Sequence, residues 1–370
     1  GSDLLLFPYD WRLNAADSAN EFGLVMNQAL AKSSTGKVNI VAHSMGGIVV
    51  KDYLAQHDDS KVNKLIFVGT PHLGAPKAFN ALNYGDDFDL KFLGLGLNRF
   101  KAKEIGQNMP GVYELLPSRE YINQSGPYVR DDRSSKSLTY DETSQFMSSD
   151  SVLPDHRNAN LLNQADSFHQ LRDNWSAQSS HVYNLIGCQD YDTIGSFQIE
   201  DGGSVDINSI SGDGTVPFVS SSHVAGQNYY INNQKTKINH LGLVKDDRSV
   251  GLIYNLINSA DQVLPEGISQ SIEECSPSIS ALPRLRFSTH SPVNLHVYDQ
   301  SGKHTGINND GNIETQIPDS DFVQVGNDSF IFVPSGSGYS VKIDAYATGS
   351  FDFKVKSLEN GEIEEALVYS

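Results

Sequence analysis

Ser44 is the residue whose surroundings most clearly suggest chemistry. It lies in the stretch VAHSMGGIVV at residues 41–50, with small residues two positions away on each side, Ala42 and Gly46. A serine nucleophile held in a sharp strand-to-helix turn requires this pattern, because bulky flanking side chains would collide with the neighbouring backbone. The first flanking position is more often glycine than alanine. The stretch predicts a nucleophilic serine, although an incidental serine in a strand, turn and helix would give a similar pattern.

The acid that such a serine needs is predicted in the loop GDGTVP at residues 212–217. A serine hydroxyl attacks well only when a base takes its proton and a carboxylate orients that base. Asp213 follows the serine in the chain order expected for this kind of site, and the glycines on either side of it allow a sharp turn. An Asp-Gly pair is also a common turn. The competing acids have less constrained settings; they are Asp190, Asp192, Asp201 and Asp206.

The base is predicted among the histidines that follow the acid. His240 stands after an apolar strand and before a helix, so it is the preferred candidate, and His223 in the polar loop SSSHVAG is the alternative. His43 should point away from a tight turn, so we expect it to pack or to form a hydrogen bond. His72, in the loop after the next strand, is expected either to line the pocket or to be purely structural.

These residues need a framework of strands and helices. Apolar runs and helical spacing alternate along the first part of the chain, which predicts a mostly parallel sheet. The expected strands are residues 3–7, 38–41, the start of 64–76, 181–188 and a strand that includes Tyr229 and Ile231. The expected helices are residues 15–32, 160–175 and the end of 240–257.

Residues 77–155 interrupt this alternation. They contain apolar pairs such as Phe92-Leu93 and Leu115-Leu116 among polar, Ser- and Asp-rich stretches. An insertion of this length in an α/β fold is more often a cap or lid than a linker. We therefore expect this segment to cover the site, with apolar residues that include Phe88, Leu93, Leu95 and Leu97.

The composition changes after residue 262. Residues 263–283 are rich in Ser, Pro and Glu and are expected to be a linker. In residues 284–370 apolar side chains recur at every second position, as in Val293-Leu295-Val297, and turn signals separate these runs. That period predicts a small antiparallel β-sandwich. The sequence NNDGN at 308–312 fits a turn better than a calcium loop.

Charge and cysteine content exclude several classes of protein. The chain has 370 residues and a formal net charge of −18, which argues against nucleic-acid binding and gives no attraction to anionic membranes. No apolar run is long enough to span a membrane, and no signal peptide is evident. Two cysteines, Cys188 and Cys275, make neither a disulfide framework nor a zinc site, so a single bridge is the remaining alternative to free thiols. We expect no metal and no cofactor.

Several motifs in order resemble the lecithin:cholesterol acyltransferase family. They are FPYDWR, VAHSMGG, GTPHLGAP, YELLPS, and GDGTVP followed by NHLGLV, and they extend from residue 3 to about residue 260. The resemblance implies an α/β-hydrolase fold over residues 1–262, a triad of Ser44, Asp213 and His240, and an acyl-enzyme formed from a lipid ester. The tail more weakly resembles β-sandwich modules of secreted microbial proteins, which implies secretion.

The oxyanion hole is where the sequence departs from the family pattern. The N–H of Met45 should supply one donor, and a loop after an earlier strand should supply the second. No such strand precedes FPYDWR, and the chain stops within an apparent strand at EALVYS. We therefore expect a fragment that lacks N-terminal strands of the sheet and the end of the sandwich.

The sequence thus predicts a serine acyl-hydrolase or O-acyltransferase that acts on lipid esters, at a membrane or lipid-aggregate surface. Hydrolysis and transfer differ only in whether water or an alcohol accepts the acyl group, and the residues leave that open. The alternative is a catalytically silent lipid- or surface-binding protein whose β-sandwich does the binding. The intact order of serine, acid and histidine favours the enzyme.

Overall fold

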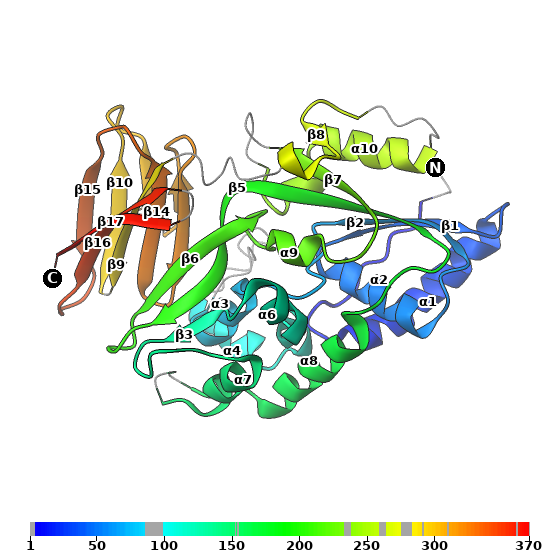
Figure 1. The fold of residues 1–370 in the computed structure, drawn as a ribbon, viewed down its shortest axis with the longest axis horizontal. Helices are drawn as coiled ribbons and strands as arrows, with labels where there is room; N and C mark the ends of the chain where they lie inside the picture. The colour runs from blue at the N-terminus through cyan, green and yellow to red at the C-terminus, as the bar shows by residue number, and fades with distance from the viewer. Residues whose placement is uncertain are drawn as a thin grey trace.

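A parallel sheet with helices on both faces forms the first part of the chain (Figure 1). The computed structural model describes residues 4–85, 99–151, 153, 155–232, 238–258, 264–274, 283–290, 292–308, 311–359 and 362–369. The parallel strands run in the order β1 (Val38–His43), β2 (Val62–Val68), β5 (His181–Ile199) and β7 (Gln227–Asn232). The short strand β8 (Ile268–Ser269) pairs antiparallel with β7, inside the segment predicted as a linker.

Separate apolar clusters cover the two faces of this sheet. On one face α1 (Ala15–Lys32) and α2 (Met45–Gln56) pack on residues such as Ile40 and Phe67. On the other face α10 (Asp247–Asn258) packs on residues such as Ile66 and Leu185. Successive side chains of β2 thus point into different clusters, as the pleat requires. The predicted α/β-hydrolase-type fold is confirmed.

Helix α1 has the bounds that its sequence predicts, because its start and its apolar face are both encoded locally. The side chain of Asn14 accepts a hydrogen bond from the N–H of Asp17 and caps the first turn. Ala15, Ala19, Phe22 and Met26 are buried at helical spacing.

Strand β5 is much longer than the predicted 181–188 and belongs to two parts of the fold. Its first half lies in the parallel sheet, and its second half pairs antiparallel with β6 (Val205–Gly212) and parallel with β3 (Val129–Asp131). Strand β4 (Lys136–Ser137) pairs with β3. The register of β5 with β6 shifts at three places, so bulges interrupt the two-residue period.

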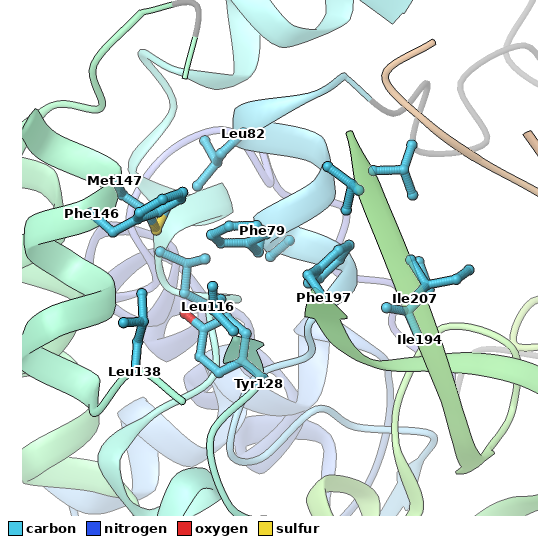
Figure 2. Packing of buried hydrophobic residues seen from close by; sticks show 14 of the residues in the cluster. Phe79, Leu82, Leu116, Tyr128, Leu138, Phe146, Met147, Ile194, Phe197 and Ile207 are labelled. Carbon is cyan, nitrogen blue, oxygen red and sulfur yellow. The ribbon is translucent and has the colours of Figure 1, made fainter. Parts of the chain in front are cut away.

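The segment between β2 and β5 is mostly helical. Its helices are α3 (Lys77–Asn83), α4 (Arg99–Gly106), α5 (Pro110–Tyr113), α6 (Arg119–Ser125), α7 (Tyr140–Ser149) and α8 (Ala159–Arg172). Figure 2 shows Phe79 of α3 and Phe146 of α7 in one apolar cluster with Phe197 and Ile207 of the extended β5–β6 hairpin. The residues named above for the lid, from Phe88 to Leu97, and the Phe92-Leu93 pair lie outside the described residues, so the lid stays a prediction.

The C-terminal part consists of two antiparallel sheets, as predicted. The first contains β10 (Val293–Tyr298), β11 (His304–Ile307), β12 (Ile313–Thr315) and β15 (Ser340–Ala345). The second contains β9 (Arg284–His290), β13 (Asp321–Val325), β14 (Asp328–Pro334), β16 (Asp352–Glu359) and β17 (Glu362–Tyr369). Side chains of both sheets, Leu295 and Ile331 among them, meet in one core. Asn308 and Gly311 are joined by a backbone hydrogen bond of 2.9 Å, in the stretch predicted as a turn.

The second of these sheets also packs against the part of the chain that contains the parallel sheet. Phe330 and Phe332 of β14 belong to the same buried cluster as Phe79. Arg286 of β9 donates to the carboxylate of Asp206 on β6 at 2.7 Å, and Lys356 of β16 pairs with the same carboxylate. The β-sandwich is therefore built into the core of the molecule, and one of its faces is not available to a ligand.

One predicted strand is wrong. Residues 4–10 have no regular secondary structure, and the side chains of Leu4 and Leu6 are 75% and 80% exposed. Within the described residues β1 pairs with β2 alone and lies at the edge of the sheet. An apolar run becomes a strand only where a neighbouring strand pairs with it, and in the described part of the chain no strand pairs with residues 4–7.

Candidate active site

The turn that carries Ser44 is strained, as the predicted nucleophile turn requires. β1 ends at His43, α2 begins at Met45, and Ser44 between them has φ 55° and ψ −134°. It is one of three non-glycine residues with positive φ in the described part of the chain. A Cβ added to Gly47 would lie 2.1 Å from Thr70 Oγ1, so α2 can start here only with glycine at that position. Strain of this kind costs on the order of 1–3 kcal/mol and persists where the surroundings enforce it.

The structure brings Ser44, His240 and Asp213 together. His240 Nε2 lies 2.7 Å from Ser44 Oγ, and His240 Nδ1 lies 2.7 Å from Asp213 Oδ2. Because a carboxylate only accepts, Nδ1 carries the proton, which leaves Nε2 to accept the hydrogen bond from the serine hydroxyl. This tautomer is the one in which the imidazole can take the serine proton.

The carboxylate of Asp213 is fixed on both oxygens. Its Oδ1 accepts from the backbone N–H groups of Thr215 and Val216 at 3.0 and 2.7 Å, which leaves Oδ2 for the histidine. The residue is 2% exposed. Its loop turns through Gly214, which has φ 86° and donates to Thr193 Oγ1. The constrained loop predicted from GDGTVP is thus what holds the acid.

Two further glycines let the backbone approach this group closely. A Cβ on Gly187 of β5 would lie 2.7 Å from Asp213 Cβ. A Cβ on Gly69, which follows β2 with φ 55°, would lie 3.0 Å from Asp213 Oδ2 and 3.3 Å from His240 Cε1. Glycine within or just after a strand often marks such an approach, and this signal was present in the sequence.

The other predicted histidines have different partners. His223 Nε2 donates to the carbonyl of Asp173 at 2.7 Å, and its Nδ1 accepts from Gln124, so the alternative base is held away from the serine. His72 is fully buried, its ring edge packs on Phe67, and burial lowers its pKa well below the usual value. The expectation that His72 is structural is therefore the better supported of the two.

His43 forms the hydrogen bond that its position suggested. Its Nε2 lies 3.1 Å from the backbone oxygen of His240, and the two imidazole centroids are 4.8 Å apart. Burial, followed by the neighbouring His240, lowers the pKa of His43 to about 4.

The competing acids are not at this site where the structure describes them. Asp206 is buried with Arg286 at the sandwich contact, and Asp201 lies exposed in the turn between β5 and β6. The side chains of Asp190 and Asp192 are outside the described part.

Met45 is the first residue of α2, so its N–H lies at the positive end of a helix beside Ser44. Its side chain is buried and packs on Gly111. A Cβ added to Gly111 would lie 2.8 Å from Met45 Cε. The ring of Tyr9 lies 3.8 Å from where a Cβ of Gly46 would be. The chain around FPYDWR thus packs beside the turn although it is not a strand.

A buried polar network behind α2 was not predicted. His169 of α8 faces two acceptors at 2.9 Å, the carboxylate of Asp173 and the carbonyl of Glu114, so both its nitrogens must carry protons. Glu114 Oε2 accepts from the N–H of Ala15 at the start of α1. Burial raises the pKa of Glu114 to about 7. His169, Asp173 and Glu114 lie at two helices that are far apart in the sequence and form no motif, so nothing in the sequence indicated this network.

Two remaining expectations concern metals and cysteines. Within the described ranges no group of three or more His, Cys, Asp or Glu side chains could hold a metal ion.

No helix in those ranges is long and apolar enough to cross a membrane. Cys188 is disulfide-bonded, and Cys275, the other cysteine of the sequence, lies outside the described residues.

Comparison with known proteins agrees with the motifs. The family model for lecithin:cholesterol acyltransferase matches residues 2–180. Phospholipase A(1) LCAT3 of Arabidopsis thaliana is 26% identical over 140 residues, which cover 35% of this chain and 31% of that protein. Lecithin-cholesterol acyltransferase-like 4 of the same plant is 25% identical over 126 residues, covering 31% of this chain and 23% of that protein. The matched part thus spans less than a third of either relative.

Similar solved structures are more distant. Tle4 in the Tle4–Tli4 complex has a TM-score of 0.45 at 17% identity, with 65% of each chain covered. The Bacillus licheniformis lipase BlEst2 has a TM-score of 0.34 at 15% identity, covering 97% of this chain and 63% of that one. Identification therefore depends on the sequence match, which includes the strained turn and the loop after β2. Residues 2–180 of this chain are thus similar to the lecithin:cholesterol acyltransferase family.

Proposed function

We propose that this protein is a serine acyl-hydrolase or O-acyltransferase of lipid esters. Ser44 is the nucleophile, His240 the general base and acid, and Asp213 the carboxylate that orients the histidine. The observation that carries the proposal is the pair of 2.7 Å hydrogen bonds that links these residues, with Ser44 in a strained turn. The similarity of residues 2–180 to the lecithin:cholesterol acyltransferase family supports a lipid ester as substrate.

The reaction follows from the geometry. Ser44 Oγ attacks the ester carbonyl while His240 Nε2 takes the serine proton, and the tetrahedral oxyanion accepts a hydrogen bond from the N–H of Met45. When this intermediate collapses, His240 gives its proton to the departing alcohol and the acyl group remains on Ser44. Water or a second alcohol then attacks the acyl-enzyme by the same proton transfers in reverse order. These steps require only groups of the chain and the two substrates.

We further propose that the protein acts outside the cell. Disulfides persist in oxidising compartments, so the bonded state of Cys188 supports secretion. A water-insoluble ester would then be met at a membrane or lipid-aggregate surface.

A fluorophosphonate probe tests the proposal, because it labels only an activated serine. We expect labelling to map to Ser44 and to vanish in Ser44→Ala and His240→Ala, whereas His223→Ala, a matched histidine variant, should label like the unaltered chain. Product analysis of mixed lipid esters, with and without a sterol or diacylglycerol, then separates hydrolysis from transfer. A folded protein that neither labels nor cleaves any ester would establish the silent binding protein instead.

A further inference from the structure

The residue before the nucleophile contacts the base as well. His43 ends β1 and is joined by one peptide bond to Ser44, and its Nε2 lies 3.1 Å from the main-chain oxygen of His240. Since a carbonyl oxygen only accepts, Nε2 of His43 carries the proton and donates it. His240 is thereby held at three atoms: Nε2 by Ser44, Nδ1 by Asp213 and the carbonyl oxygen by His43.

The third contact differs from the other two in what it fixes. The triad bonds orient the imidazole ring, and neither of them contacts the backbone of the loop. The hydrogen bond from His43 attaches that backbone to the end of β1, which also carries the nucleophile. Beyond it the chain continues into a short 3₁₀ turn at Gly242–Val244, and residues 233–237 before it are outside the described part.

The charge of His43 also suits this position. Its ring stands 4.8 Å from that of His240, which must carry a positive charge during the reaction. A second cation at that distance would oppose this charge. Burial and the neighbouring imidazole keep the pKa of His43 at about 4, so it is neutral at any ordinary working pH. The side chain thus provides a donor without a competing charge.

We infer that His43 is a positioning residue for the proposed reaction: through its hydrogen bond to the His240 carbonyl it sets the distance between base and nucleophile. This inference rests on the proposed function. A base displaced by about 1 Å can lose roughly a hundredfold in rate, so a single backbone contact is enough to matter.

The test compares two amides at this position. In His43→Gln the amide nitrogen can occupy the place of Nε2 and donate to the same carbonyl, whereas the shorter side chain of His43→Asn cannot reach it. We expect His43→Asn to lower kcat by roughly 10- to 100-fold with KM nearly unchanged, and His43→Gln to recover most of the loss. His57→Phe is the matched control, because His57 also donates to a backbone carbonyl, that of Tyr53 at 3.0 Å, on the exposed end of α2. Its kcat should equal that of the unaltered chain.

A measurement that does not depend on turnover separates the positioning role of His43 from the proposed ester chemistry. The proton shared by His240 Nδ1 and Asp213 should give a low-field NMR signal, which should persist in His43→Gln and His57→Phe but shift or exchange faster in His43→Asn. If the unaltered chain cleaves no ester yet shows this pattern, the proposed function fails, while the contact from His43 to the His240 backbone still positions the imidazole. If His43→Asn keeps both the kcat and the signal of the unaltered chain, the positioning role is wrong.

Discussion

Gly187 and Asp213 approach so closely that a Cβ on the glycine would lie 2.7 Å from the Cβ of the aspartate. Real Cβ atoms do not come that near, so Gly187→Ala must push Asp213 away from His240. We expect ester cleavage to fall by roughly 10- to 100-fold, since a displacement of about 1 Å costs that much. Gly251→Ala is the matched control, because nothing lies within 4 Å of its added methyl group. Equal kcat in the two variants would contradict the close approach.

The backbone strain at Ser44 predicts that a glycine at this position makes the protein more stable than an alanine does. Glycine reaches φ 55° at little cost, whereas alanine keeps the strain. Both Ser44→Gly and Ser44→Ala should be inactive, but Ser44→Gly should have a free energy of unfolding about 1 kcal/mol higher than Ser44→Ala. Urea unfolding of the two variants measures the difference. If Ser44→Ala proves as stable as Ser44→Gly, the turn is not strained.

Glu114 predicts a pH dependence of stability. Burial raises its pKa from 4.5 to about 7, so between these values the folded protein binds more protons than the unfolded chain. Stability is therefore greatest at or below the unfolded pKa and falls as pH rises through about 7, by about 3 kcal/mol from this group. Glu114→Gln can still accept from Ala15, so it should remove this part of the decline. The free energy of unfolding at pH 5, 6, 7 and 8 tests it, and parallel curves for the two proteins would refute it.

Asp206 should matter to stability although it is not one of the proposed catalytic residues. It is buried between Arg286 and Lys356, so Asp206→Asn leaves two cations without their carboxylate. Breaking a buried pair costs about 3–5 kcal/mol, and we expect the melting temperature to drop accordingly. Lys342→Gln breaks the exposed pair with Asp344 and is the control, with no measurable change expected. If the two variants have the same melting temperature, the contact between Asp206 and the β-sandwich does not stabilise the protein.

The elements that could be predicted are those whose signals are local. Helix α1 carries its own cap and apolar face, and β1 and β2 are short apolar runs beside turn residues. The second half of β5 was not predicted, because bulges interrupt its alternation of buried and exposed side chains. Its residues Phe197 and Ile199 are nevertheless fully buried. The apolar run at 4–7 has the residues of a strand, but among the residues that the structure describes no strand pairs with it.

In the candidate site, too, the residues that could be predicted are those with a local sequence signal. Ser44 and Asp213 sit in turns whose glycines and small residues encode the backbone geometry, so their motifs could be recognised. The order of residues along the chain predicts His240, whose two ring nitrogens lie 2.7 Å from Asp213 Oδ2 and Ser44 Oγ. The network of Glu114, His169 and Asp173 could not be predicted, because its partners meet only after the helices have packed.

The ion pairs of Asp206 also impose an order on folding. Its two cationic partners lie 80 and 150 residues further along the chain. At ribosomal speeds of about 5–20 residues per second, Lys356 is synthesised roughly 8–30 s after Asp206. Until then the β5–β6 hairpin presents an uncompensated charge where its core should close, and the apolar surface that β14 will cover is exposed. The contact between the β5–β6 hairpin and the β-sandwich can therefore be completed only after Lys356 has been synthesised.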